Sequence, residues 1–283
     1  MKRIRGGRGL GDSIYLRPIA EHFIRAGWRV VVMSDYADVF LGSGAGVEPF
    51  GRRDINVHAH YTLGKSNPMT NQWQDVCASA GVKGVPLSFA WSGRNTALIA
   101  GVKSEAAGRP IVLVHGGREP MERADKFGAE LLPRREAFDA VLAEMRDCFT
   151  VQIGKAEQLY PLATNVNLNG GTTVSDLLDL ACVCDGVVAQ CSFAIPLAEV
   201  FDKPLLVVWA AAGLASRQPY IRTIAPFKVL SKPRDQYLMD DRSTEDIRML
   251  VGSWSTGVVL RKAFDEAENR HIHRDEERAK CAS

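Results

Sequence analysis

The chain of 283 residues lacks the features on which several large classes of protein depend. No apolar run reaches the ~18 residues that a membrane-spanning helix needs, and no apolar stretch follows the basic first residues, so we expect neither a membrane anchor nor a signal peptide. The six cysteines include no Cys-x-x-Cys pair, which argues against a zinc site and favours reduced thiols in a cytoplasmic protein. Positive and negative charges nearly balance, with a net charge of +2, which permits an anionic ligand but does not indicate a protein that coats nucleic acid.

Common catalytic and nucleotide-binding motifs are also absent from the sequence. No serine stands in a Gly-x-Ser-x-Gly motif, which argues against a Ser-His-Asp hydrolase. The glycine-rich segment 6–12 is followed by Ile14 where a dinucleotide-binding turn would have its third glycine, and it lacks the Gly-Lys-Ser/Thr of a P-loop. Cys191 is a candidate nucleophile for which the sequence shows no base.

What the sequence does contain is a regular alternation of buried strands and amphipathic helices. A short strand at 2–5, the glycine-rich turn, a helix that contains Pro18 and a strand at 28–34 form one β-α-β unit. The same pattern restarts with the apolar strand at 110–117. The alternation predicts the α/β class, with two Rossmann-like parallel domains that face a cleft.

The boundary between the two predicted domains is placed in the small and polar stretch 101–110. A helix is expected at 173–184, with Asp176 and Asp179 on its polar side. The predicted units are an N-terminal domain, a C-terminal domain and a helical tail, at residues 1–107, 108–242 and 243–283.

The loops that follow the strands of the second domain hold candidate binding residues, because ligands of such sheets bind beyond the carboxyl ends of the strands. Glycines there let a ligand come close to the backbone, cationic side chains match phosphate oxygens, and the amides of a helix start attract anions. Tight turns and surface charges explain the same residues without a ligand. The candidates are Gly116, Gly117, Arg118, Gly154, Lys155, Gln190, Ser192 and Phe193, with Lys126 in reserve.

The glycine-rich loop of the first domain places Asp12 at the start of the first helix. Its carboxylate either caps the helix or acts as a general base, and the two roles are compatible. Arg8, Gly9 and Gly11 in the same loop are candidate neighbours of the acceptor or of a donor phosphate.

Two segments resemble the ADP-heptose:lipopolysaccharide heptosyltransferases, which form glycosyltransferase family 9. The first is RGLGDSIYLRPIAEHFIRAGWRVVVMS, with the Gly11-Asp12 pair and Pro18, and the second is LNGGTTVSDLLDLACVCDGVVAQCSFAIPLAEVFDKPLLVVW. The resemblance implies a GT-B fold and a glycosyltransferase that uses no metal or other cofactor. It also implies that the second domain binds a nucleotide-sugar donor, that the first binds an acceptor glycan, and that Asp12 is the catalytic base.

The chain departs from the family pattern in the second segment. Cys191 and Pro196 stand where the family has an aspartate and a histidine, whereas Ser192 keeps the family's Ser/Thr position. The donor and the acceptor therefore stay open. One alternative is transfer to hydroxymethylated bases of viral DNA, and others are a non-catalytic nucleotide- or sugar-binding protein with a decayed donor site and an epimerase-like enzyme. The basic residues that would favour DNA, and that are equally explained as solvated charges, are Lys2, Arg3, Arg5, Arg8, Arg52, Arg53 and Arg94.

Overall fold

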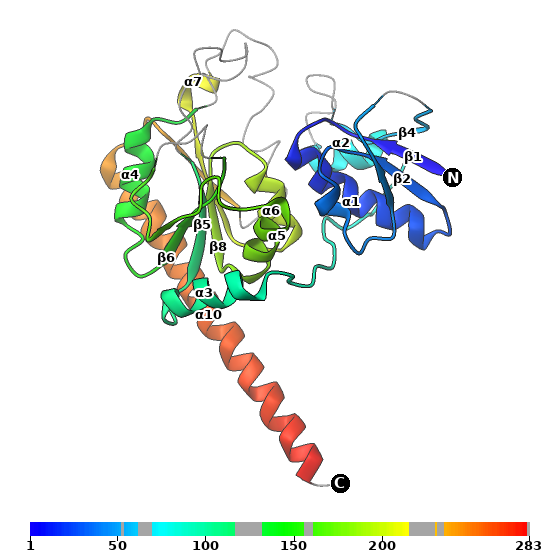
Figure 1. The fold of residues 1–283 in the computed structure, drawn as a ribbon. Coiled ribbons are helices and arrows are strands. Elements are labelled where there is room, and N and C mark those ends of the chain that lie inside the picture. Colours follow the sequence, from blue (N-terminus) through cyan, green and yellow to red (C-terminus); the bar gives the residue numbers. More distant parts are fainter. Residues whose placement is uncertain are drawn as a thin grey trace.

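The computed structural model shows two parallel sheets, each flanked by helices, and a long C-terminal helix that extends away from both (Figure 1). The structure describes residues 1–51, 54–61, 70–116, 132–155, 161–214, 230 and 235–281.

The first sheet has the strand order β3-β2-β1-β4, with every pair parallel. Its strands are β1 (Lys2–Arg5), β2 (Val30–Met33), β3 (Gly46–Glu48) and β4 (Val57–His58). Its helices are α1 (Leu10–Arg25), the 3-10 helix η1 (Ala37–Phe40) and α2 (Gln72–Ser79). All four residues of β2 are apolar and buried, which is typical of a parallel strand covered on both faces.

The second sheet has the order β10-β9-β8-β5-β6-β7, again all parallel. Its strands are β5 (Ile111–His115), β6 (Phe149–Gln152), β7 (Val166–Asn167), β8 (Gly186–Ala189), β9 (Leu205–Trp209) and β10 (Gln236–Met239). Its helices are α3 (Thr96–Ala106), α4 (Arg135–Ala143), α5 (Val174–Val183), α6 (Ala194–Val200), α7 (Ala211–Leu214) and α10 (Thr244–Cys281). From β5 onward this is the strand order of the Rossmann fold, so the predicted α/β class is confirmed.

The two sheets share one apolar core. A single cluster of buried residues contains Ile4 and Leu16 from the first sheet and its helix as well as Leu113 and Leu197 from the second. Helices α1 and α6 pack against each other where the two halves meet. A second cluster, with Phe138 at its centre, fills the far face of the second sheet under α4 and α10.

Two details of the sequence prediction change at the level of single helices. Helix α1 begins at Leu10 and runs through Pro18 to Arg25. The stretch 101–110, where the domain boundary was expected to be a linker, is mostly helical, because α3 occupies residues 101–106 of it and packs against α5 of the second half. Helix α3 contains three alanines, which are the best helix formers. The domain bounds themselves stay a prediction, although the two sheets do fall on either side of residue 107.

The connection between the halves is the segment 86–95, and two buried charged side chains bind it, one at its middle and one along its second half. Arg17 of α1 donates hydrogen bonds to the carbonyls of Val39, 2.7 Å away, and Ala90, 2.8 Å away. Asp179 of α5 accepts from Trp91 Nε1 at 2.6 Å and from the amide of Asn95 at 2.7 Å.

Asp179 therefore does not lie on a polar face of α5, as the helical pattern predicted. Its exposed fraction is 0%. The physical reason is that the partner of this face is the connecting segment, whose amide and indole donors satisfy the carboxylate. Burying a carboxylate is tolerated where such donors surround it.

Candidate active site at the two strand-order switch points

Each sheet has one point where the strand order reverses, and ligands of parallel sheets bind at the carboxyl ends of the strands there. In the first sheet this point lies between β1 and β4. The loop after β1 leads to Asp12, the third residue of α1, and the segment after β4 leads to Tyr61. The helix cap is Gly9 and not Asp12, but the Asp12 carboxylate accepts the Gly9 amide at 2.9 Å.

The surroundings of Asp12 suit a general base. Burial raises the pKa of its carboxyl above the ordinary value, and this effect outweighs hydrogen bonds with the Gly9 amide and the Tyr61 side chain, which lower it. A carboxylate with a raised pKa is a stronger base at neutral pH. The same side chain thus accepts the Gly9 amide at the start of α1 and has a raised pKa.

In the second sheet the order reverses between β5 and β8. The ends of these strands are tied together, because the Gln190 amide donates to the His115 carbonyl at 2.9 Å. The rings of His115 and Phe193 meet edge to face, with centroids 4.6 Å apart. The Ser192 hydroxyl accepts the Ala194 amide at 3.2 Å, so this predicted donor residue lies at the start of α6.

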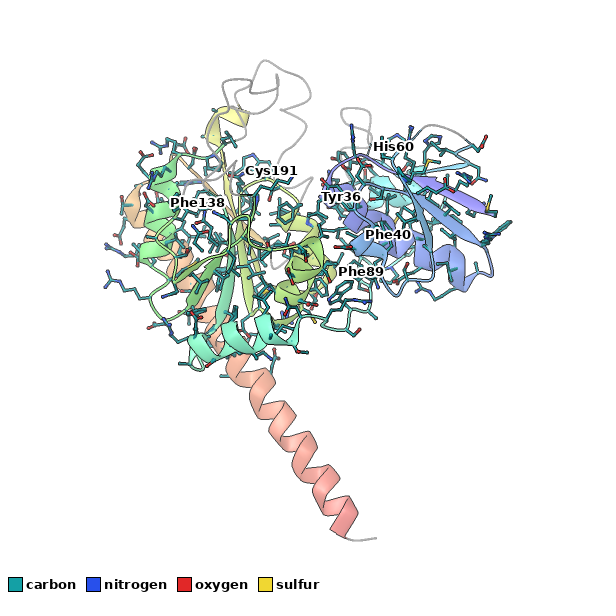
Figure 2. All side chains as sticks on the ribbon, viewed as in Figure 1. Tyr36, Phe40, His60, Phe89, Phe138 and Cys191 are labelled. Atoms are coloured by element: carbon teal, nitrogen blue, oxygen red, sulfur yellow. The ribbon has the colours of Figure 1, made fainter. Side chains whose placement is uncertain are left out.

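The two switch points touch through Gly11. A Cβ on this residue would lie 3.3 Å from both Phe193 Cα and Pro196 Cγ. A side chain on residue 11 would crowd α6, so the close approach of the start of α1 to α6 favours glycine here. Figure 2 labels Cys191 after β8 and His60 after β4 at the same end of the two sheets, where their carboxyl ends lie. Through Gly11, the structure therefore brings the start of α1, which holds Asp12, against the predicted donor residue Phe193.

Of the remaining predicted donor residues, Gly116 follows β5 at the switch point, and the others lie one strand farther along the sheet or outside the described residues. Gly154 and the exposed Lys155 follow β6, one strand beyond β5. Gly116 packs on Phe138, because a Cβ there would lie 2.3 Å from the Phe138 ring; this packing explains the glycine without a ligand. The residues that lie outside the described part of the chain are Gly117, Arg118 and Lys126.

Cys191 does not have the properties of a nucleophile. Burial raises the pKa of its thiol to about 12, so the reactive thiolate is scarce at neutral pH.

The basic residues that would favour a nucleic-acid partner are engaged within the chain where the structure describes them. Arg8 is 77% exposed and pairs with Asp35, with 2.9 Å between Nε and Oδ2. The Arg94 guanidinium lies 5.3 Å from the centre of the Trp91 ring. The others are Lys2 over the rings of Phe23 and Trp28, Arg3 paired with Glu48, and Arg5 on the carbonyl of Gly51. Arg52 and Arg53 lie outside the described residues.

Three residues near Asp12 were missed from the sequence. Tyr61 comes shortly after strand β4, and its position beyond the carboxyl end of a strand is the one feature of the sequence that could have identified it as a site residue. Tyr15 and Glu199 lie among the apolar residues of α1 and α6, and both are buried, with exposed fractions of 3% and 0%. Tyr15 stands three residues after Asp12, a spacing that places both on one helix face.

Comparison with solved structures connects this geometry to a known fold. Escherichia coli ADP-heptose lipopolysaccharide heptosyltransferase II is 14% identical and superposes with a TM-score of 0.57 over 93% of this chain and 100% of that chain. The glycosyl transferase family 9 structure from Veillonella parvula is 10% identical, with a TM-score of 0.57 over 90% and 97%. The structure of E. coli heptosyltransferase WaaC with ADP is 9% identical and superposes with a TM-score of 0.53 over 90% of this chain and 100% of that chain. The chain has the fold of these glycosyltransferases.

The expected GT-B arrangement is thereby confirmed, whereas the sequence itself lies far from its structural neighbours. No protein-family model matches it, and no curated protein matches it either. The comparisons thus establish the fold, and the function of this chain has to be argued from its own residues.

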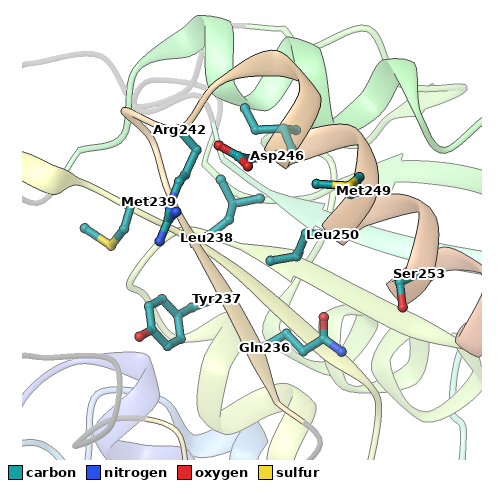
Figure 3. Close-up of a pocket in the computed structure, with 10 residues that line it drawn as sticks. Gln236, Tyr237, Leu238, Met239, Arg242, Asp246, Met249, Leu250 and Ser253 are labelled. Carbon is teal, nitrogen blue, oxygen red and sulfur yellow. The ribbon is translucent and has the colours of Figure 1, made fainter.

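Other candidate sites add little to this one. A cavity of about 500 Å³ lies between β10, at the outer edge of the second sheet, and the first turns of α10, with Tyr237, Met249 and Leu250 in its lining (Figure 3). It includes none of the predicted site residues. Within the described ranges no three or more His, Cys, Asp or Glu side chains gather as metal ligands. No helix in that part of the chain is long and apolar enough to cross a bilayer.

Proposed function

We propose that the protein is a glycosyltransferase that moves a sugar from a nucleotide-sugar donor to an acceptor hydroxyl, with Asp12 as the general base. The observation that carries the proposal is the position of Asp12. Its carboxylate has a raised pKa, lies at the switch point of the first sheet, and adjoins the residues at the switch point of the second through Gly11. The structural neighbours named above as heptosyltransferases support the reaction class.

In the proposed reaction, Asp12 takes the proton of the acceptor hydroxyl while the acceptor oxygen bonds to the anomeric carbon. The bond from that carbon to the diphosphate oxygen breaks, and its electron pair leaves with the nucleoside diphosphate. A single displacement of this kind inverts the anomeric carbon. Ser192, Lys155 and Arg118 are the proposed partners of the developing phosphate charge, and the reaction as proposed needs no metal ion.

Loss of the base tests the proposal directly. Asp12→Asn should lower kcat for transfer by about 10²–10⁴-fold, since the amide cannot accept the proton. Binding of the nucleoside diphosphate should persist, because Asp12 is not placed at the phosphates. A panel of nucleotides and nucleotide sugars, scored by thermal shift, finds the donor: a ligand at 100 times its Kd adds about 2.7 kcal/mol to stability.

Asp139→Asn is the control, since Asp139 is a half-exposed carboxylate on α4 that pairs with Arg135, and neither residue is among the candidate site residues. It should keep full activity, and activity should also persist in EDTA. Turnover that survives Asp12→Asn would contradict the base assignment. The absence of binding by any nucleotide would contradict the donor assignment.

A non-catalytic binding protein is the second candidate, and the observation that favours it is the pair Cys191 and Pro196 at the family's polar positions. It predicts nucleotide binding without turnover in the unmodified protein. Transfer to modified DNA gains no support from the comparisons, and the described basic residues are held by partners within the chain.

A further inference from the structure

The contact between α1 and α6 contains two buried polar side chains for which the proposed reaction has so far given no role. These are Tyr15 in the middle of α1 and Glu199 near the end of α6. A glutamate is almost never fully buried unless a partner satisfies it. Here it is buried where two halves of the molecule meet, in a helix that is otherwise apolar.

Helical spacing places the two side chains one turn beyond the contact of Gly11 with Pro196. Gly11 touches Pro196, and the residues one turn farther along each helix are Tyr15, four after Gly11, and Glu199, three after Pro196. The two helices thus make one contact at their starts, next to Asp12, and a second contact one turn deeper. Burial raises the pKa of the Tyr15 hydroxyl most, and the charges of Glu199, Tyr61, Asp12 and Cys191 raise it further, so these four groups lie within electrostatic reach of Tyr15.

The Tyr15 side chain is also fixed by the first half of the molecule. Its hydroxyl donates to Gln72 Oε1 at 3.3 Å, and its ring stacks on Trp73, with centroids 5.8 Å apart. Tyr15 is thus fixed to α2 of the first half of the molecule. Glu199 is fixed to α6 of the second half. A shift of α6 relative to α2 would therefore change the distance between the two side chains.

We propose that Tyr15 and Glu199 are a positioning pair that sets the start of α6 against Asp12, and so aligns the donor with the base. Neither residue touches the reacting atoms. The proposal rests on the proposed function for its kinetic consequence, but the pair itself is defined by the packing of α1 on α6.

The first test needs no substrate. The Asp12 carboxyl is titrated by NMR in protein labelled with ¹³C at the aspartate carboxyls, and its signal is identified by its loss in Asp12→Asn. Glu199→Gln should shift the Asp12 titration to lower pH, because a negative charge near the site is removed. The side chain that acts directly on Asp12 is Tyr61, whereas Glu199, Cys191 and Asp12 itself are the groups that act with it on Tyr15. Tyr15→Phe, which keeps the ring packing, should also shift the titration and serves if Glu199→Gln does not fold.

Asp179→Asn is the matched control, because Asp179 is equally buried between the halves but is bound to the connecting segment. It should lower the melting temperature and leave the Asp12 titration unchanged. A shift of equal size in Asp179→Asn, or no shift in either Glu199→Gln or Tyr15→Phe, would overturn the pair.

The second test uses turnover once a donor is found. Each single variant should lower kcat by about 10- to 100-fold, as misplacement by about 1 Å does, while KM for the donor stays within about twofold. The double variant should be no slower than the slower single variant, because the two residues act as a unit. Fully multiplicative losses would overturn the proposal. Shifted Asp12 titrations without transfer to any acceptor would support the pair and contradict the proposed function.

Discussion

Removal of the Asp179 side chain should be the most destabilising single change at the junction of the two halves. Asp179→Ala leaves three hydrogen-bond donors without their acceptor: Trp91 Nε1, at 2.6 Å from the carboxylate, and the amides of Arg94 and Asn95, at 3.0 and 2.7 Å. Each unsatisfied donor costs roughly 1–3 kcal/mol when it stays buried. Arg94 and Asn95 are exposed, so water can reach their amides, while Trp91 is half-buried. We therefore expect a loss of about 1.5–3 kcal/mol, the usual contribution of hydrogen bonds to a charged group, with most of it from the Trp91 indole.

Urea unfolding followed by circular dichroism measures this loss. Asp176→Ala is the matched control, because Asp176 lies one turn earlier on α5, caps the helix through Thr173 and accepts one hydrogen bond from the Asn95 side chain. It should cost about 1 kcal/mol, as the loss of a cap does. An Asp179→Ala loss below about 1 kcal/mol, or equal losses in both variants, would refute the claim that Asp179 fastens the connecting segment.

Two further predictions concern ionisable groups. Burial raises the pKa of Cys77 and Cys148 to about 11 and of Cys184 and Cys191 to about 12. The buried thiols of Cys77, Cys148 and Cys184 should therefore resist iodoacetamide at pH 8 until urea is added, whereas the half-buried Cys191 should react slowly because little thiolate is present. Rapid labelling of Cys77, Cys148 or Cys184 in the native protein, detected by mass spectrometry, would contradict their burial. Folding raises the pKa of Asp12, so the charged carboxylate destabilises the folded protein at pH values above that pKa. The neutral side chain of Asp12→Asn should therefore raise Tm at pH 8 by a few degrees. Each kcal/mol gained corresponds to about 2–4 °C. The gain should fade as the pH is lowered through the raised pKa toward the ordinary value, and an equal gain at all pH values would contradict the assignment.

The sequence was sufficient for the elements whose residues are locally consistent. The apolar runs of β5, β8 and β9 and the alternation of strands and helices predicted the parallel sheets, and the Gly11-Asp12 pair predicted the position of the candidate base. Short elements carried less information. Strand β4 has two residues, so Tyr61, which follows it closely, had no clear place in a sheet before the structure was known.

The errors share a physical cause, because they lie where the two halves meet. Helical periodicity assigns a charged residue to solvent, and this holds when one half is considered alone. Asp179, Arg17 and Glu199 are nevertheless buried, because each faces the other half or the segment that joins the halves. The alanine-rich stretch of α3 was taken for a linker for the same reason, since its packing partner α5 is distant in the sequence. A charged residue inside an otherwise apolar helix of a two-sheet protein is therefore better interpreted as a contact between the sheets than as an exposed position. In this chain that rule alone would have selected Glu199, whose neighbours in α6 are all apolar.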